Sequence, residues 1–353
     1  MSLTDAYGRK MEYLRISLTD KCNLRCRYCM PREGMKRLRH EDILTLEEVY
    51  RIAAVLTEMG ICRIRLTGGE PLVRKGIDGL VEKLGALPGR PELALTTNGV
   101  LLEDHLEEFW AAGLRQVNIS LDTLDPAVYR DLTGTDRLTE AERALEKAMQ
   151  MGFSVKLNAV PIRGINEGEL IHLAAYARNN RIDVRFIELM PIGCARDFQG
   201  INSGDILKML EAEFGPAETA DSEEVVTSVK NPAMLGDERQ NAAMPEKDEF
   251  SGNKGPARYV RFRGFAGRVG FISPMSDAFC RDCNRLRLTV DGKLKLCLYY
   301  PDGPDLLGLL RQGISDGELK NVIRTAVLQK PEKHCFTGTG SAEEKRSMFE
   351  IGG

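Results

Sequence analysis

The sequence has no long apolar run, no large net charge and no histidines at ligand spacing, and each absence argues against a class of protein. No stretch reaches about 18 uncharged apolar residues, the length of a membrane-spanning helix, and Asp5, Arg9, Lys10 and Glu12 already charge the start of the chain. We therefore expect no membrane span, no signal peptide and a cytoplasmic location. The formal charge of -3 argues against broad affinity for nucleic acid. The four histidines are expected to be structural.

Cysteine is what the sequence does have, with nine residues in 353. Six of them form two groups of three, one near each end of the chain: Cys22, Cys26 and Cys29, then Cys280, Cys283 and Cys297. A cytoplasmic compartment keeps thiols reduced, which suits metal ligation. The other three, Cys62, Cys194 and Cys335, are isolated in the sequence and are expected to be small buried residues.

Two kinds of metal site fit a group of three thiolates. A cubane iron–sulfur cluster held by three cysteines keeps one iron free to bind another molecule, which makes the cluster a reaction centre. Zinc is the alternative, because closely spaced thiolates also build structural zinc sites. Those sites usually close with a fourth ligand, and neither group has an obvious one nearby. The spacing favours iron–sulfur clusters and leaves zinc open.

From residue 12 to about 215, short apolar runs alternate with longer amphipathic stretches, a rhythm that is typical of repeated βα units. The predicted strands are Tyr13–Leu18, Ile61–Leu66, Glu92–Thr97, Gln116–Leu121, Val155–Val160 and Val184–Leu189. The predicted helices cover 45–59, 77–85, 103–112, 139–151, 167–180 and 203–213. Helix-start signals accompany them: Thr45 three residues before Glu48, Pro126 after Asp125, and Asn202-Ser203 before Asp205.

Six parallel strands form either an open doubly wound sheet or a wall that curves toward a barrel, and spacing alone does not choose between them. Both arrangements place function at the carboxyl ends of the strands. Polar residues gather at those ends, over 67–70, 96–99 and 120–123. We therefore expect the functional residues to gather at the carboxyl ends of the strands, a region called the mouth below.

The chain is long enough for one large domain and a smaller one. We predict a first domain over 1–218, a polar linker or mobile insertion over 219–257, and a C-terminal domain over 258–353. Within the last part, the patterns of 258–264, 269–273 and 286–298 indicate a small antiparallel element that carries the second cysteine group.

The first cysteine group resembles the signature of the radical S-adenosylmethionine enzymes. It has CxxxCxxC spacing with Tyr28 just before the last cysteine, and Gly68-Gly69-Glu70 resembles the GGE motif of those enzymes. The resemblance implies an incomplete (β/α)6 TIM-type barrel, a 4Fe-4S cluster on these cysteines and S-adenosylmethionine as a cofactor. The two glycines are expected to let the backbone come close to that cofactor. The implied cofactor contacts are Tyr28, Gly68, Gly69, Glu70, Thr96, Asn98, Ser120 and Met190.

The second cysteine group resembles the C-terminal motif of the molybdenum cofactor biosynthesis protein A family, the GTP 3′,8-cyclases. The similarity extends over 129–134, 186–190, 330–334 and the closing Ile351-Gly352-Gly353. It implies a C-terminal α+β extension in which Cys280, Cys283 and Cys297 hold a second 4Fe-4S cluster that anchors guanine. The implied reaction converts GTP to 3′,8-cyclo-7,8-dihydro-GTP, the first step of molybdenum cofactor biosynthesis. In it, a 5′-deoxyadenosyl radical takes the hydrogen from ribose C3′.

The same resemblance implies which residues bind the substrate. A triphosphate needs converging cations in a chain that is close to neutral overall. A lone arginine is usually an exposed surface charge, but one inside an apolar strand needs a buried partner, which a polyphosphate would supply. Arg15 and the Gly352-Gly353 tail are implied to be catalytic. The implied GTP contacts are Arg15, Arg63, Arg65, Lys156, Arg185, Arg285 and Arg287.

The implied partners besides GTP are an electron donor such as flavodoxin or ferredoxin, the next enzyme of the molybdenum cofactor pathway, and a second copy of the chain in a homodimer. Two alternatives stay open. One is another radical enzyme with an auxiliary cluster, such as a maturase that modifies peptides. The other is a non-catalytic zinc-binding module. The arginines and the Gly-Gly end favour a nucleotide substrate over a peptide.

Overall fold

We describe the fold from a computed structural model, which describes residues 2–31, 38–220, 255–276, 279–334 and 346–352. Most of the predicted insertion over 219–257, together with Cys335 and Gly353, lies outside the described residues.

All six predicted βα units are confirmed, with strand bounds that differ from the predicted ones by at most two residues. The strands are β1 (Tyr13–Ser17), β2 (Arg63–Thr67), β3 (Glu92–Thr97), β4 (Gln116–Ser120), β5 (Ser154–Ala159) and β6 (Asp183–Ile187). The helices between and after them are α1 (Leu46–Glu58), α2 (Ile77–Gly85), α3 (Leu106–Ala111), α4 (Pro126–Thr133), α5 (Leu138–Gln150), α6 (Leu170–Asn179) and α7 (Ser203–Phe214). Short 3-10 turns precede several helices: η1 (His40–Asp42), η2 (Pro71–Val73), η3 (Leu102–His105), η4 (Glu167–Glu169) and η5 (Gly193–Asp197).

The helix-start signals of the sequence are confirmed. Thr45 and Glu48 form a reciprocal capping box at the start of α1, in which each side chain accepts the backbone N–H of the other residue. Asp125 accepts the backbone N–H groups that follow Pro126 and so begins α4, a helix that the predicted ranges left out. The local chemistry of these residues therefore fixes where each helix begins.

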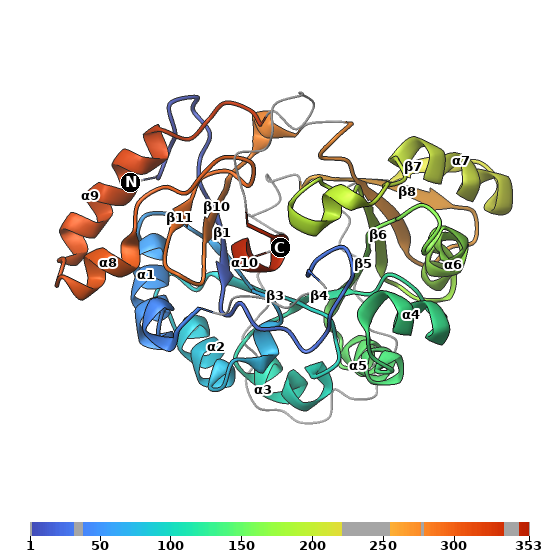
Figure 1. Ribbon diagram of the computed structural model, residues 1–353, viewed down its shortest axis with the longest axis horizontal. Coiled ribbons are helices and arrows are strands. Elements are labelled where there is room, and N and C mark those ends of the chain that lie inside the picture. Colours follow the sequence, from blue (N-terminus) through green and yellow to red (C-terminus); the bar gives the residue numbers. More distant parts are fainter. Residues whose placement is uncertain (1, 32–37, 221–254, 277–278, 335–345, 353) are drawn as a thin grey trace, which may run out of the picture.

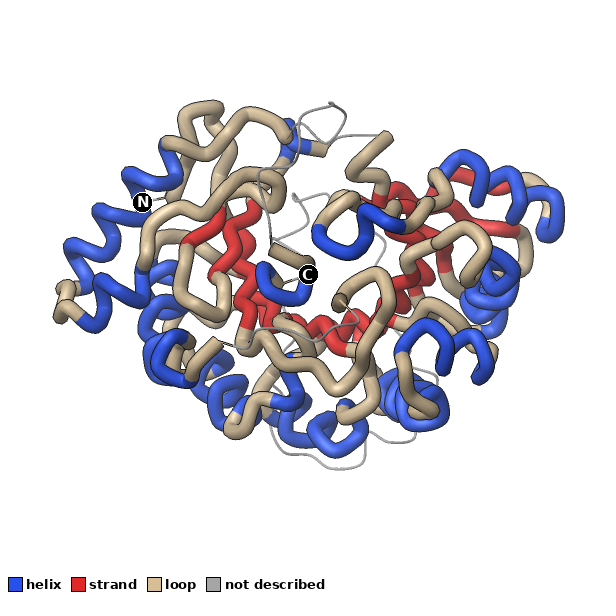
Figure 2. Tube along the Cα trace, in the orientation of Figure 1, coloured by secondary structure: helices blue, strands red, loops and turns tan. Residues whose placement is uncertain are grey.

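One sheet runs through the whole described chain, in the order β11-β10-β1-β2-β3-β4-β5-β6-β9-β8-β7. The strands from β10 to β9 in this order are all parallel, and antiparallel strands occupy both edges. Because β1 to β6 follow one another in sequence order, the doubly wound alternative, in which the order reverses, does not hold. The sheet curves, and the helices α1 to α6 cover its outer side (Figure 1, Figure 2).

The prediction of one small antiparallel element after the insertion is wrong, because its strands are divided between the two edges of the sheet. At one edge, β9 (Arg268–Ile272) pairs parallel with β6 and antiparallel with β8 (Ala257–Phe262), which pairs with β7 (Ala217–Ala220). At the other edge, β10 (Arg285–Leu288) pairs parallel with β1 and antiparallel with β11 (Leu294–Lys295). The sequence alternation gave each strand a buried face, but it does not say which neighbour that strand joins.

The apolar face of β10 explains its position at the edge of β1. Leu286 and Leu288 are fully buried and align with Leu14 and Ile16 of β1 in the same apolar layer. After β11 the chain adds α8 (Leu306–Arg311) and α9 (Asp316–Leu328), which the sequence did not indicate, and α9 packs against α1. The chain ends in the short helix α10 (Met348–Ile351), which lies inside the curve of the strands (Figure 1). Across the described residues, none of the helices has the length and apolar character needed to cross a membrane.

Candidate active site

The first cysteine group follows β1 in a segment that is fastened to the glycine-rich loop after β2. Three backbone hydrogen bonds join them, from Leu18 N to Thr67 O at 2.9 Å, from Gly69 N to Thr19 O at 2.7 Å, and from Glu70 N to Lys21 O at 2.8 Å. The two loops therefore continue the pairing of β1 and β2 beyond the strands, and this pairing fixes where the first cysteine begins.

The close approach of these loops is what requires glycine at positions 68 and 69. A Cβ on Gly68 would lie 2.7 Å from the carbonyl oxygen of Thr19, and one on Gly69 would lie 2.4 Å from that of Lys21. That these glycines let the backbone come close to a cofactor stays a prediction. The structure shows that the backbone of the cysteine-bearing segment occupies the space of both Cβ atoms, so the glycines admit that segment.

Glu70, after β2, and Asn98, after β3, brace the same region. Both carboxylate oxygens of Glu70 accept hydrogen bonds from the protein, from Leu72 N, Thr97 Oγ1 and Asn98 N. Burial raises the pKa of Glu70 to about 7 in spite of these donors. The Asn98 amide donates to Asn23 Oδ1 at 2.7 Å, within the cysteine-bearing loop. Glu70 and Asn98 therefore hold the loop in place.

The three cysteines of the first group are half-buried and lie close together. Burial raises the pKa of Cys22 to about 11 and of Cys29 to about 12, and burial followed by the neighbouring Cys29 raises that of Cys26 well above its usual value. Among the described residues, no three side chains of His, Cys, Asp or Glu converge on the position of a single metal ion. In addition to burial, Cys29 and Cys22 raise the pKa of Cys26, and Cys22 raises that of Cys29, so the three thiols lie close enough to act on one another. Three such thiols are the donor set of a 4Fe-4S cluster that leaves one iron open.

Tyr28, inside the cysteine motif, is tied to the carboxyl end of β4. Its hydroxyl donates to Asp122 Oδ2 at 2.8 Å, and Asp122 Oδ1 accepts from Val160 N at 2.7 Å. Burial raises the pKa of Asp122 to about 6. Sequence reasoning listed Tyr28 as a cofactor contact and missed its anchor, Asp122, although that residue stands among the polar residues that follow β4.

Four neighbouring polar side chains at the carboxyl ends of β1 to β4 are buried without a hydrogen-bond partner in the described part of the chain. They are Ser17, Thr67, Thr96 and Asn118, unpartnered at Oγ, Oγ1, Oγ1 and Oδ1 respectively. Ser17 aligns with Thr67 across β1 and β2, and Thr96 aligns with Asn118 across β3 and β4. Buried polar atoms are nearly always satisfied, so this row is suited to a polar ligand. Only Thr96 was predicted, because the other three resemble ordinary strand residues.

The remaining predicted cofactor contacts lie around the same mouth. Ser120 ends β4 and is exposed. Met190 follows β6 and packs on a small apolar cluster made of Ile192, Tyr299 and Ile351, against which Cys297 also packs. Met190 and the last cysteine of the second group are thus brought to one place by the C-terminal helix.

The second cysteine group is surrounded by cations. The short turn η7 (Cys280–Asp282) holds Cys280, whose carbonyl oxygen accepts from Arg9 at 2.8 Å and whose sulfur accepts from His334 N. Lys330 is buried behind the group and hydrogen-bonds the carbonyl oxygens of Arg285 and Leu296. Burial opposes ionisation of Cys283, but Lys330 and Arg285 outweigh it and lower the pKa of that thiol.

The predicted substrate cations of β10, β1 and β2 lie in two adjacent rows on the inner face of the sheet. Arg287, Arg15 and Arg65 align in one row. Arg285, Tyr13 and Arg63 align in the next, which ends at Glu92 on β3. Positions that align across parallel strands face the same side, so the register itself brings these guanidinium groups together.

Several of these cations have polar partners in the described part of the chain. Arg63 pairs with Glu92 at 2.6 Å, Arg65 donates to the Tyr13 hydroxyl, and Arg185 on β6 donates to Asn158 at 2.8 Å. Burial by itself would raise the pKa of Tyr13, yet Arg65, Arg15 and Arg285 together lower it to about 7. Sequence reasoning missed this tyrosine because a tyrosine in a strand is usually a packing residue.

The cations themselves are perturbed by burial and by one another. Burial, then Arg287, lowers the pKa of Arg15 well below its usual value. Burial, then Arg285, lowers that of Arg287 to about 10, and burial, then Arg185, lowers that of Lys156 on β5 to about 8. Arg63 and Arg65 also act on Lys156, which connects the two sides of the mouth. An arrangement that disfavours its own positive charge favours a bound polyanion.

The C-terminal tail lies between the two cysteine groups. The backbone N–H of Phe349 donates to the Cys29 thiol, and Ile351 belongs to the apolar cluster that Cys297 contacts. Arg287 donates to the carbonyl oxygen of Gly352 at 2.5 Å, beside Ser17 and Thr67. The described part of the predicted tail therefore reaches the centre of the mouth, and Gly353 lies outside the described residues.

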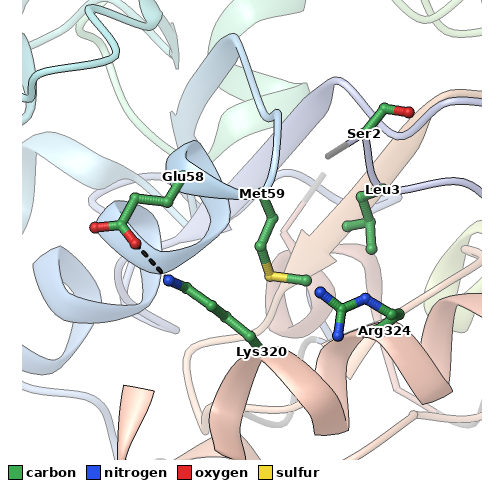
Figure 3. Close-up of a pocket in the computed structure, with 6 residues that line it drawn as sticks. All are labelled: Ser2, Leu3, Glu58, Met59, Lys320 and Arg324. Carbon is green, nitrogen blue, oxygen red and sulfur yellow. Dashed lines mark hydrogen bonds and ion pairs between the residues drawn. The ribbon is translucent and has the colours of Figure 1, made fainter. Parts of the chain in front are cut away.

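A cavity of about 170 Å³ lies elsewhere, in the outer helical layer (Figure 3). It is lined by Ser2, Leu3, Glu58, Met59, Lys320 and Arg324. Two of these lining residues form an ion pair, in which the Lys320 ammonium points to Glu58 at 2.5 Å (Figure 3). None of the predicted site residues lines this cavity, so it is separate from the mouth.

Comparison with known families gives two matches along the chain. Residues 16–177 match the Radical SAM superfamily, and residues 212–336 match the family described as Molybdenum Cofactor Synthesis C. The first range contains the first cysteine group and the polar row, and the second contains the second cysteine group.

Similar proteins span the full length. The chain is 40% identical over 351 residues to a protein named GTP 3′,8-cyclase from Clostridium perfringens (strain SM101 / Type A), covering 99% of this chain and 100% of the relative. It is 43% identical over 352 residues to the protein of that name from Peptoclostridium acidaminophilum, covering 99% and 98%. A protein of the same name from Moorella thermoacetica (strain ATCC 39073 / JCM 9320) is also 43% identical over 352 residues, covering 99% of this chain and 100% of the relative.

Among solved structures, the chain resembles the crystal structure of Streptococcus suis SuiB bound to S-adenosylmethionine, with a TM-score of 0.53 and 15% identity. The match covers 98% of this chain and 76% of that one. At this identity the likeness concerns the fold alone, which is the α/β radical SAM fold with a mostly parallel sheet.

Proposed function

Because this chain belongs to the family of GTP 3′,8-cyclases, we propose how its residues divide the reaction of that family. The enzyme converts GTP to 3′,8-cyclo-7,8-dihydro-GTP in the first step of molybdenum cofactor biosynthesis. Its cofactors are S-adenosylmethionine and a 4Fe-4S cluster. When bound, they supply the 5′-deoxyadenosyl radical that takes the hydrogen from ribose C3′.

The architecture that we propose is an incomplete (β/α)6 TIM-type barrel with a C-terminal α+β extension. The sequential order of β1 to β6 and the outward position of their helices support the partial barrel. The division at 1–218, 219–257 and 258–353 remains a prediction. Because β9 and β10 join the same sheet on either side of β1 to β6, the extension is built onto both edges of the barrel.

Cys22, Cys26 and Cys29 would hold the first cluster, and their donor set fits it, as argued above. For S-adenosylmethionine, the unpartnered oxygen of Thr96 and the neighbouring unpartnered Ser17, Thr67 and Asn118 support a polar ligand at this position. In our proposal Thr96, Ser120 and Met190 contact this cofactor. Tyr28, Gly68, Gly69, Glu70 and Asn98 shape the loops around it.

Cys280, Cys283 and Cys297 would hold a second 4Fe-4S cluster, which would supply an open iron to anchor the guanine. Three thiols in one cationic environment support this proposal, since anionic clusters and ligands are stabilised there. Cys297 and Cys29 both contact the C-terminal tail, so the two groups open toward one space. A single GTP then spans the distance from one group to the other.

The protein's own residues bind and orient the triphosphate. Arg15, Arg63, Arg65, Lys156, Arg185, Arg285 and Arg287 supply the positive charge from five strands. Fixing both the phosphates and the base presents C3′ and C8 to each other, which lowers the entropic cost of closing the new bond. Arg15 and Gly352 complete the wall of the mouth and keep water from the radical, and the part of Gly353 in the same tail remains a prediction.

The alignment of Arg287, Arg15 and Arg65 across three strands carries the assignment of GTP as substrate. The test is anaerobic reconstitution followed by incubation with reductant, S-adenosylmethionine and either GTP, ATP or no nucleotide. We expect about eight irons and eight sulfides per chain, and a cyclised nucleotide with GTP alone by mass spectrometry. Stoichiometric zinc, or equal conversion of ATP, would overturn the proposal.

The other predicted partners follow from the chemistry. Reductive cleavage of S-adenosylmethionine needs an electron, which an electron donor such as flavodoxin or ferredoxin would supply, and the product needs the next enzyme of the molybdenum cofactor pathway. The homodimer and the cytoplasmic location remain predictions. We set aside the peptide maturase and the zinc module, since the full-length relatives are cyclases.

A further inference from the structure

Lys330 is a buried cation with no ion pair in the described part of the chain. Its side chain stands two residues after α9, and the residue is only 3% exposed. Lysine is almost never buried to this extent unless its charge is compensated. The ammonium donates to two backbone carbonyl oxygens, that of Arg285 at 2.9 Å and that of Leu296. Carbonyl dipoles compensate a full charge only in part, so a further anion at this position would stabilise the lysine.

The two carbonyl groups belong to the two segments that carry the second cysteine group. Arg285 follows Cys283 by two residues at the start of β10, and Leu296 directly precedes Cys297 after β11. The ammonium therefore bridges these segments from behind. Both Cys283 and Cys297 lie within the electrostatic reach of Lys330.

The buried charged groups around the two cysteine groups differ in sign. The buried carboxyl groups of Glu70 and Asp122 each act to raise the pKa of a thiol in the first group, where the exposed Arg25 acts on Cys22 in the opposite direction. The second group instead faces Lys330, Arg285 and Arg9. Of these three cations, Arg9 is paired with Asp5 at 2.6 Å and Arg285 lies over the Phe279 ring among the substrate cations. Lys330 is thus the buried positive charge that belongs to the second group alone.

We propose that Lys330 is a positioning residue of the second cysteine site, which joins the segments of Cys283 and Cys297 and makes a cluster held there easier to reduce. This inference rests on the proposed second cluster. Accepting an electron makes a cluster more negative, and a buried positive charge stabilises the more negative state. The positive charge of Lys330 also offsets the negative charge of the thiolates that hold the cluster, which reduces their repulsion of a polyanionic substrate.

The test isolates the second cluster in a variant whose Cys22, Cys26 and Cys29 are replaced by alanine, so that one set of signals remains. In that background Lys330→Gln keeps a hydrogen-bond donor and removes the charge, and Lys330→Arg keeps the charge. Lys320→Met is the matched control, because it removes a lysine from the surface of α9 at the Glu58 ion pair. Iron content and a redox titration followed by electron paramagnetic resonance are measured for each.

We expect about four irons per chain in the background variant, and a shift to a more negative reduction potential in Lys330→Gln but not in Lys330→Arg or Lys320→Met. Loss of iron from Lys330→Gln alone, with the first cluster still assembled when its cysteines are restored, also supports the inference. An unchanged potential with full iron content in Lys330→Gln would overturn it while leaving the proposed function intact. No iron in the background variant with Lys330 present would overturn the second cluster and the inference together.

Discussion

Replacing Gly352 with alanine should release the C-terminal tail from the mouth without unfolding the protein. Gly352 has φ of +77°, in the left-handed region that glycine adopts freely. An added Cβ would lie 3.0 Å from Ser17 Cβ and 3.2 Å from Thr67 Oγ1. Both neighbours are the last residues of strands inside the sheet, so neither can retreat easily.

The size of the effect follows from two terms. Holding alanine in the left-handed region costs roughly 1–2 kcal/mol. The hydrogen bond from the Arg287 guanidinium to Gly352, the contact that the substitution disturbs, is worth about 1.5–3 kcal/mol. The conformational cost of alanine is therefore comparable to the free energy of this hydrogen bond. The ratio of docked to undocked tail should fall about 5- to 30-fold. The free energy of unfolding should fall by no more than this penalty.

Two measurements check this expectation, the initial rate of GTP conversion and the hydrogen exchange of the Phe349 and Ile351 amides. Gly113→Ala is the matched control, because Gly113 has φ of +89° with no atom within 4 Å of the added Cβ. It should lose similar stability and keep the full rate. Gly352→Ala should lose rate and exchange its tail amides faster, with its iron content unchanged. Deleting Gly352 and Gly353 should impair turnover in the same way.

Two results would refute the reasoning. If the tail amides of Gly352→Ala exchange faster while GTP is converted at the parental rate, the tail has no part in the reaction. If neither exchange nor rate changes, the contacts with Ser17 and Thr67 do not hold the tail.

Three further predictions concern the second cluster, the cation rows and the sheet. Cys297→Ser should still allow uncoupled cleavage of S-adenosylmethionine but abolish the cyclised product, and the measurement quantifies 5′-deoxyadenosine and the cyclised product separately. Retained conversion of GTP in this variant would contradict the anchoring of guanine by the second cysteine group. Tyr13 has its pKa lowered from 10.0 to about 7, so its phenolate absorbance should appear as pH rises through 7 and be missing in Tyr13→Phe. Between pH 7 and 10 the unfolded state binds this proton and the folded state does not, so the tyrosine contributes stability that is present in full above pH 10 and is lost as pH falls through 7. In urea titrations across that window, the free energy of unfolding of Tyr13→Phe should depend less steeply on pH than that of the parent protein. An identical pH dependence in the two proteins would count against the lowered pKa. Asp183 and Arg268 form an ion pair with two hydrogen bonds between β6 and β9, and each side chain is 2% exposed. Asp183→Ala should therefore lower the free energy of unfolding, measured in urea, by about 3–5 kcal/mol. A loss below about 1 kcal/mol would show that the guanidinium finds other partners.

The βα units could be predicted because their signals are local. The apolar runs of β1 to β6 and the caps at Thr45 and Asp125 depend only on neighbouring residues, and the structure follows them closely. The position of β10 could not be predicted in this way. Its alternating leucines fit any edge that offers an apolar layer, and only the assembled sheet shows that they align with Leu14 and Ile16.

The site shows the same division between local and assembled information. The cysteine spacing and the glycine motif identify the cofactor class, but the reason for Gly68 lies in the backbone of Thr19, which the chain brings close only after folding. Ser17 and Thr67 look like ordinary strand residues until their register places both beside Gly352. Lys330 was missed for a different reason, since lysine side chains are mostly exposed.

The distribution of charge explains how one mouth can serve two chemistries. Arg15, Arg287 and the half-buried Lys156 raise the electrostatic cost of the site when it holds no anion, as their lowered pKa values show. In the proposed function a triphosphate removes that cost, whereas the first cysteine group lies near the buried carboxyl groups of Glu70 and Asp122 and offers a polyanion no such gain. On this proposal, the strand register that gathers the arginines also directs the substrate to the cationic side of the mouth, and the first cysteine group stays open for the smaller, less negative cofactor.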